Sequence, residues 1–187
     1  MPELGQGLGW RFPGSGANYM AIDTDGTITS TELPNMLVQT VSANSTALIT
    51  VTGTITEDDS IPQNNEGTEV LTVSITPKSS TNILEIEFVS SGVFPTTGAN
   101  NIALFQDATA NALAAGFGSN SDGTNIGILQ YNLKYRMAAG TTSSTTFKIR
   151  CSNGSGGTLY LNGTTTGPTR LWGGTASTYL TIKEYQA

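Results

Sequence analysis

Histidine is absent from this sequence of 187 residues, and cysteine occurs once, at Cys151. Without histidine the chain cannot form a Ser-His or Cys-His nucleophilic pair or a histidine-ligated zinc site. A single cysteine excludes an internal disulfide and a thiolate metal cluster. The absences restrict any catalytic chemistry to carboxylates, lysine, tyrosine, or serine paired with lysine.

Charged side chains are also scarce, at 12% of the chain, with 8 basic and 14 acidic residues and a net charge of −6. Nucleic-acid binding needs clustered Lys and Arg that neutralise phosphates, and the basic residues here are scattered. No apolar run is long enough to span a membrane. The N-terminal stretch MPELGQGLGW has neither the basic nor the apolar region of a signal peptide. We therefore expect neither nucleic acid nor membrane as a partner, and synthesis in the cytoplasm of a cell.

Glycine, threonine, serine and asparagine are abundant, and from about Leu37 onward apolar and polar residues alternate between turn signals. A period of two indicates half-buried strands, and some eight to ten such runs without helical crossovers favour an antiparallel sandwich. The stretch NIGILQYNLKYRMA is the longest. The sequence therefore predicts an all-β antiparallel β-sandwich of jelly-roll type. In the longest run the side chains expected to point inward are Leu129, Tyr131, Leu133, Tyr135 and Met137.

Two further runs lead to specific expectations. Ile49, Val51 and Ile55 share one side of a predicted strand that ends near Ile55. The alanine-rich stretch FQDATANALAAGFG contains Thr, Asn and Gly, which disfavour a helix. We expect a hairpin there, running over residues 102–107 and 112–117.

Residues 1–36 have a different character. The stretch GQGLGWRFPGSG is too rich in Gly and Pro for a regular element, and a turn is expected at Asp25-Gly26. The segment nevertheless contains several large apolar side chains. Such a segment folds against a neighbouring subunit or a larger assembly, or wraps its own sandwich, and the sequence leaves both open. We expect an irregular N-terminal arm over 1–36 and a knob domain over 37–187. The apolar residues of the arm are Leu8, Trp10, Phe12, Tyr19 and Met20.

The stretch TEDDSIPQNNEGTEVL concentrates five carboxylates, at Glu57, Asp58, Asp59, Glu66 and Glu69. A retaining glycosidase needs two carboxyl groups about 5 Å apart, whereas adjacent residues on an extended chain point to opposite faces. Oxygen ligands within one loop could hold calcium, although the spacing matches no calcium motif. We favour a solvated connection between two strands, with a cation site as the alternative.

Other candidates are weaker. Glu85 and Glu87 are expected to be outward, solvated charges, and Cys151 a small buried hydrophobe. Tyr160 and Trp172 are expected to be exposed, where they could stack on sugar rings or fill a seam between subunits. No set of residues supports a catalytic site, and we therefore expect a protein that is not an enzyme and that has no cofactor and no resident metal.

Several separated motifs carry a resemblance over residues 37–187. They are DDSIPQNNEGTEVLTVSITPKSSTNILEIEF, IALFQDATANALAAGFG, YRMAAGTTSSTTFKIR, GGTLYLNG and LTIKEY. Together they resemble a β-domain found at the C-termini of tail fibres and other virion surface proteins of tailed bacteriophages. The resemblance implies a trimeric jelly-roll knob, displayed on the virion for attachment to host surfaces or for capping other proteins. It brings no catalytic residues with it.

The expected function is therefore that of a capsid decoration (cement) protein on the virion surface. Its trimeric knobs would stabilise the shell, with the arm gripping the major capsid protein. The alternative is a receptor-binding knob of a tail fibre or other tail appendage that recognises host surface polysaccharide. Aromatic and arginine side chains dominate most interfaces. The expected arm anchors are Leu8, Trp10, Arg11 and Phe12.

Overall fold

The computed structural model describes residues 21–22, 28–29, 35–94, 98–120, 127–153, 157–164 and 169–187. These residues form β-strands and one short 3-10 turn, Trp172–Gly174. Eight of the strands in the described residues have seven or more residues: β3 (Leu37–Ser45), β5 (Thr68–Ile75), β6 (Ile83–Phe94), β7 (Gly98–Gln106), β8 (Ala114–Asn120), β9 (Gly127–Ala138), β10 (Thr145–Asn153) and β14 (Thr178–Tyr185). The shorter strands are β1 (Ala21–Ile22), β2 (Ile28–Thr29), β4 (Ile49–Val51), β11 (Leu159–Leu161), β12 (Gly163–Thr164) and β13 (Thr169–Arg170).

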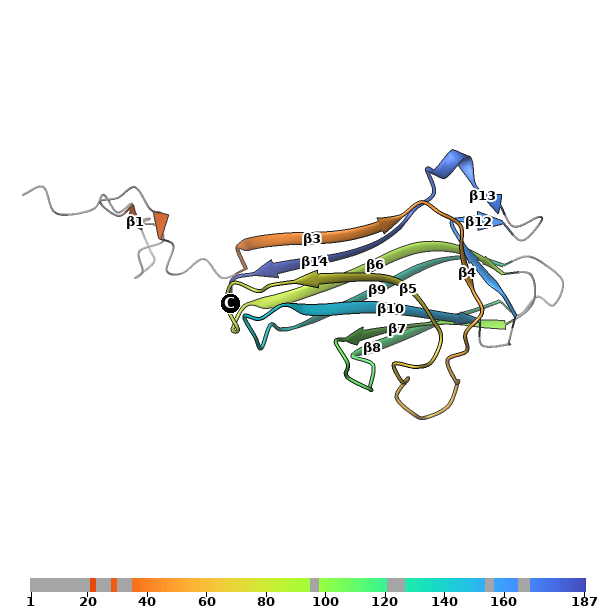
Figure 1. The fold of residues 1–187 in the computed structure, drawn as a ribbon, viewed down its shortest axis with the longest axis horizontal. Coiled ribbons are helices and arrows are strands. Elements are labelled where there is room, and N and C mark those ends of the chain that lie inside the picture. Colours follow the sequence, from red (N-terminus) through yellow and green to blue (C-terminus); the bar gives the residue numbers. More distant parts are fainter. Residues whose placement is uncertain are drawn as a thin grey trace, which may run out of the picture.

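The long strands form two antiparallel sheets. The first has the order β3-β14-β6, with β9 on the other edge of β6 and with β11 and β4 continuing beside the end of β6. The second has the order β5-β10-β7-β8. Figure 1 shows the strands of both sheets running along the long axis of the molecule. The expected all-β antiparallel sandwich is confirmed.

The core lies between the sheets, and the predicted alternation places it correctly. Apolar side chains at every second position of the central strands are buried, because each strand turns one face inward. Full burial of one such side chain contributes roughly 1.5–3 kcal/mol relative to exposure. The completely or almost completely buried members are Leu84, Ile86, Phe88, Leu104, Phe147, Ile149, Leu159, Leu161, Leu180 and Ile182.

The expectations for β9 and for the hairpin are also confirmed, with shifted bounds. Tyr131 is buried, the alternate residues that follow it pack against the core, and the residues between them are exposed. The predicted inward side chain of Leu129 lies outside the described residues. β7 pairs with β8 from Leu104↔Ala114 to Gly98↔Asn120, so both strands extend further from the turn than predicted.

The prediction that one strand continues to Ile55 was wrong. β4 ends at Val51, and the chain then leaves the sheet. Gly53 explains the exit, since a Cβ added there would lie 2.3 Å from the carbonyl carbon of Gly67. This backbone-to-backbone approach starts an excursion over residues 52–67, which we call the acidic loop.

The chain enters the sandwich beside its own C-terminus. The amide of Asn35 donates to the carbonyl of Gln186 at 2.9 Å, and the amide of Gln186 donates to the carbonyl of Met36 at 2.9 Å. Within the predicted arm, β1 and β2 pair antiparallel through Ala21↔Thr29 and Ile22↔Ile28. The predicted turn at Asp25-Gly26 and all four predicted anchors, Leu8, Trp10, Arg11 and Phe12, lie outside the described residues.

Candidate binding surface

The acidic loop covers the outer face of β7. Ala103 and Phe105 point away from the sandwich core, yet they are 0% and 1% exposed because Ile55 of the loop packs against them. Ile55 itself is 2% exposed. The expected solvated connection is therefore also a structural cover with a small apolar cluster of its own.

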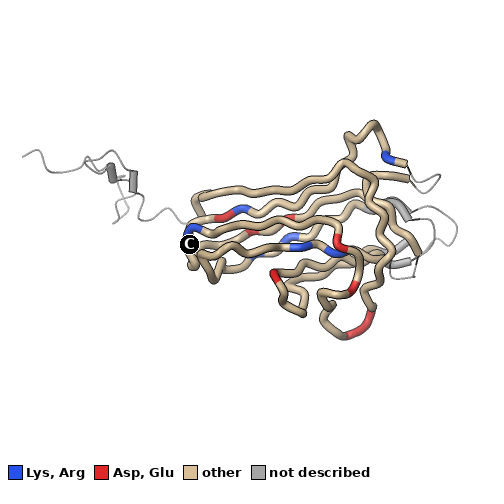
Figure 2. The backbone as a smooth tube through the Cα atoms, in the orientation of Figure 1, with Lys and Arg blue, Asp and Glu red and all other residues tan. Residues whose placement is uncertain are grey.

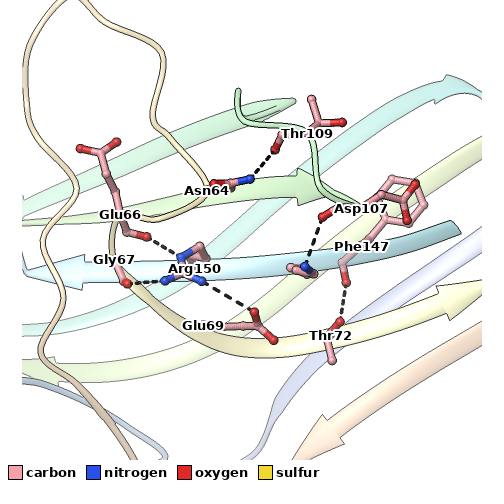
Figure 3. A network of polar contacts seen from close by, with 10 residues as sticks. Asn64, Glu66, Gly67, Glu69, Thr72, Asp107, Thr109, Phe147 and Arg150 are labelled. Carbon is pink, nitrogen blue, oxygen red and sulfur yellow. Dashed lines mark hydrogen bonds and ion pairs between the residues drawn. The ribbon is translucent and has the colours of Figure 1, made fainter.

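Arg150 of β10 fastens the end of the loop to the sheet. Its guanidinium donates through Nε to the carbonyl of Glu66 and through Nη2 to the carbonyl of Gly67, the latter at 2.8 Å. The same group pairs with the Glu69 carboxylate at 3.7 Å. Figure 3 shows Arg150 reaching from β10 toward these three residues. A guanidinium suits this task because its donors form a planar, preorganised fork.

The middle of the loop is held against the turn between β7 and β8. The Asn64 side-chain amide donates to the carbonyls of Ala108 and Thr109 at 3.2 and 3.1 Å, and Figure 3 shows the second contact. The Gln63 side chain donates to Asn111 Oδ1 at 3.0 Å. With both its end and its middle fixed, the loop presents its remaining side chains from a defined backbone.

Two of the loop carboxylates have lowered pKa values. Asp58 accepts hydrogen bonds from the hydroxyl and the amide of Ser60, and these lower its pKa from the ordinary value. The pKa of Glu66 is lowered chiefly by the Gln63 amide, which donates to its Oε2 at 2.6 Å. Both groups are thus negatively charged at neutral pH. Within the described residues, no three Asp, Glu, His or Cys side chains gather closely enough to hold a metal ion.

A groove with a volume of 410 Å³ lies between the loop and β8. Its floor includes Asn101 of β7 and Phe117 of β8, which stand opposite each other in the strand register. Its wall includes Ile55, Glu57 and Asp58 of the loop. The Phe117 side chain is 81% exposed, which is unusual for a large apolar group and marks a candidate contact surface.

Asn101 is fixed beneath this groove. Its side-chain nitrogen donates to the carbonyl of Ile55 at 3.1 Å and to Glu57 Oε1 at 3.0 Å, which settles the orientation of the amide. The residue is 5% exposed, and its Oδ1 has no hydrogen-bond partner among the residues that the structure describes. A buried acceptor without a partner is destabilising unless water or a ligand reaches it.

The sequence analysis did not single out Asn101 or Phe117. The hairpin alternation could have placed both on the outer face. Asn101 alternates with the inward Ile102 and Leu104, and Phe117 stands opposite Asn101 in the register. It could not have revealed that residues 55–62 fold over that face, because this requires the tertiary contacts of Ile55 and Arg150.

The other candidates occupy separate places. Trp172 is 73% exposed, as expected, and has a φ of 49°, whereas Tyr160 in β11 is half-buried and the expectation of an exposed ring was wrong. Glu85 pairs with Lys134 at 3.1 Å, and its side chain is only 12% exposed, so the expectation of a solvated charge was wrong for this residue. Cys151 is buried, which raises the pKa of its thiol to about 12.

Comparison with known proteins gives little further guidance. No family model matches the chain, and no curated protein matches it. A chain in the structure of infectious bursal disease virus, Gx strain, is similar with a TM-score of 0.35 and 13% identity, over 95% of this chain and 46% of that chain. This chain therefore spans less than half the length of that one, and a likeness at this level carries no conclusion about function. No helix in the described part of the chain has the length and apolarity to cross a membrane.

Proposed function

We propose that this chain is a structural protein of a bacteriophage virion, and specifically a capsid decoration protein that forms trimeric jelly-roll knobs on the exterior of the head. One observation carries the proposal: the order of the long strands. Numbered along the chain, they lie in the orders 1-8-3-6 and 2-7-4-5, which is the strand order of a jelly roll. Jelly rolls occur in viral capsid domains and in lectins.

A fold alone does not determine a function, so the virion assignment also depends on the sequence resemblance over residues 37–187. The two supports are of different kinds, because the resemblance comes from short motifs and the strand order comes from the pairing of strands in space. The described residues contribute surfaces, namely the groove beside Phe117 and the exposed Trp172. A role in assembly requires surfaces of this kind.

A decoration protein acts by adding contacts across the seams of a pressurised shell. In this proposal each trimer sits where capsid subunits meet, and three arms engage the particle at once. Linked contacts strengthen one another through effective concentration, so three weak arms give tight attachment. The arm residues proposed to matter are Leu8, Trp10, Arg11 and Phe12.

Binding of variants to purified capsids that lack the protein tests the proposal. A Trp10→Ala, Phe12→Ala double variant should lose most of its occupancy, because it removes the two aromatic anchors. Tyr179→Ala is the matched control, since it removes an exposed aromatic side chain of β14 and leaves the arm intact. Unchanged occupancy of the double variant, or an equal loss in the control, would contradict the role of the arm.

A receptor-binding knob on a tail appendage is the second candidate, and Trp172 favours it. Trp172, Gly173 and Gly174 all have positive φ values, of 49°, 62° and 94°. A left-handed backbone is unfavourable for tryptophan, and such strain is concentrated at functional sites. The turn projects the indole into solvent, where it could stack on a sugar ring of host polysaccharide.

A further inference from the structure

The turn that carries Trp172 is held in a strained conformation. Trp172 has a φ of 49°, and its side chain is 73% exposed. Such a backbone conformation is unfavourable for a tryptophan and persists only where the surrounding contacts fix it. The carbonyl of Trp172 accepts hydrogen bonds from the amide of Thr175 at 3.2 Å and from its hydroxyl at 3.0 Å, and the amide of Gly174 donates to the carbonyl of Leu171 at 3.0 Å. The indole is therefore displayed from a fixed backbone.

Asn162 anchors the base of this turn to the sandwich. Its carbonyl accepts from the amide of Leu171 at 3.0 Å, and its side-chain nitrogen donates to the carbonyls of Ser45 and Ala47 at 2.9 and 3.0 Å. Its Oδ1 accepts from the hydroxyl of Thr178 at 3.0 Å, and the residue is 2% exposed. A backbone that is already ordered reduces the entropic cost of binding a ligand.

Arg170 lies against the same turn. A Cβ added to Gly174 would lie 2.7 Å from Nη1 and 2.9 Å from Cζ of Arg170, so the guanidinium rests directly on the glycine backbone. Trp172 and Gly174 are two residues apart, and their Cα atoms are therefore at most about 7 Å apart. The guanidinium and the indole border one small patch of surface.

The surroundings supply no carboxylate to Arg170. The sequence contains no Asp or Glu from residue 123 to residue 183. None of the ion pairs within the described part of the chain includes Arg170. Figure 2 shows a basic position where β12 and β13 lie in Figure 1, with no acidic position beside it. The planar fork of a guanidinium matches a carboxylate, so an anionic group of another molecule can pair with it.

We propose that this turn binds a sugar that carries a carboxylate, the uronic acid unit of an acidic polysaccharide. The indole of Trp172 stacks on the apolar face of a sugar ring, and Arg170 pairs with the carboxylate of that ring or of the next one. A neutral sugar would leave Arg170 without a partner. Nucleic acid fits less well, because its binding depends on several clustered cations. The inference rests on receptor binding, the second proposed function, and deepens it by naming the class of sugar.

Calorimetric titration of the full-length chain with two pairs of tetrasaccharides tests the inference. One member of each pair is a uronate, of glucuronic or of galacturonic acid, and the other is the matching neutral sugar, with a hydroxymethyl group in place of each carboxylate. At least one uronate should bind, and more tightly than its neutral match by about tenfold or more, as expected for a charge-assisted pair. Added salt should reduce the difference, since exposed charge pairs are screened. This comparison does not depend on the folding of any variant.

Variants then assign the preference to one side chain. Arg170→Gln should abolish the preference for the uronate, whereas Arg170→Lys should retain part of it, because it keeps the charge without the planar fork. Lys78→Gln is the matched control, since it removes an exposed cation from the turn between β5 and β6 and should bind like the wild type.

Tryptophan fluorescence locates the bound sugar. The chain has two tryptophans, so the emission of a full-length Trp10→Phe variant comes from Trp172 alone. The uronate should shift this emission to shorter wavelength, because a stacked sugar ring displaces water from the indole. An emission that does not change while calorimetry records binding would place the sugar elsewhere and overturn the inference.

The remaining outcomes separate the inference from the proposed functions. Equal affinity for the uronates and the neutral sugars, or an unchanged preference in Arg170→Gln, would overturn the inference and leave receptor binding at Trp172 standing. Failure of all the sugars to bind would overturn the inference and also remove the support that Trp172 gives to receptor binding. Capsid occupancy tests the decoration function separately.

Discussion

The acidic loop and Glu184 use carboxylates in opposite ways. The loop and its junction with β5 hold five carboxylates between residues 57 and 69, and Glu57, Asp58 and Asp59 are exposed. Glu184 is a single carboxylate near the end of β14, and it is 0% exposed. The comparison shows that a dense acidic cluster in a sequence indicates a solvated surface, while one isolated carboxylate can hold several elements together.

Glu184 joins three segments at the end of the sandwich. It accepts hydrogen bonds from the side chains of Gln39 at 2.5 Å and Asn82 at 2.6 Å. It also accepts from the amides of Lys78 at 2.7 Å and Ser79 at 3.3 Å. Together these contacts link β14 to β3 and to the turn between β5 and β6. A buried carboxylate is tolerated there because its oxygens are fully paired.

The largest expected effect comes from removing this carboxylate. Glu184→Ala should lower the free energy of unfolding by about 3 kcal/mol, since it leaves several buried donors without an acceptor. Urea unfolding followed by far-ultraviolet circular dichroism measures the change. Asp59→Ala, in the exposed part of the acidic loop, should change the stability by less than about 0.5 kcal/mol. Equal losses of unfolding free energy for Glu184→Ala and Asp59→Ala would contradict the proposed difference between the two regions.

A smaller loss is expected from the apolar side chain that holds the loop down. Ile55→Ala should lower the free energy of unfolding by about 2 kcal/mol, because it empties the cluster formed with Ala103 and Phe105. The variant should also be cut faster by protease within the loop. Ile61→Ala is the matched control, since that side chain is 53% exposed in the same loop. An Ile55→Ala variant as stable and as protease-resistant as this control would show that the loop is held by its polar contacts alone.

Acid should produce the smallest effect of the three. Burial raises the pKa of Glu184, but the hydrogen bonds from Gln39, Asn82 and the two amides outweigh it, and the pKa falls below the ordinary 4.5. A lowered pKa in the folded state means that the contribution of Glu184 is complete above pH 4.5 and is lost as the pH falls through the folded value. The unfolding free energy of Glu184→Gln should therefore change less between pH 6 and pH 3 than that of the wild type, roughly as linkage requires. Parallel curves would contradict the assignment, because Asp58 and Glu66 would then account for the whole dependence.

The sequence predicted the strands well, because burial on one face leaves a period of two. Tyr131 and Lys134 lie on the expected sides of β9 for this reason. The same signal was present for Glu184, which shares the parity of the buried Leu180 and Ile182, yet no prediction was made for this charged residue. The end of β4 at Val51 could not be predicted, since it depends on the approach of two backbone segments that are distant in the sequence.

The candidate groove was beyond the sequence for a related reason. Asn101 and Phe117 meet only once β7 and β8 adopt their register, and the groove exists only because Arg150 and Ile55 fix the loop over the sheet. Alternation identifies a face and contains no information about what covers it. The carboxylates made this stretch a candidate site in the sequence. Its position over β7 is explained by Ile55, which packs against Ala103 and Phe105.

An electron-microscopy map of the virus particle would test the central claim most directly, that this chain acts through surfaces assembled on a virion. The account predicts three-lobed knobs, distributed over the outside of the head at positions where capsid subunits meet. Knobs confined to the tail would favour the receptor-binding alternative over decoration. Absence of the protein from the particle would contradict both.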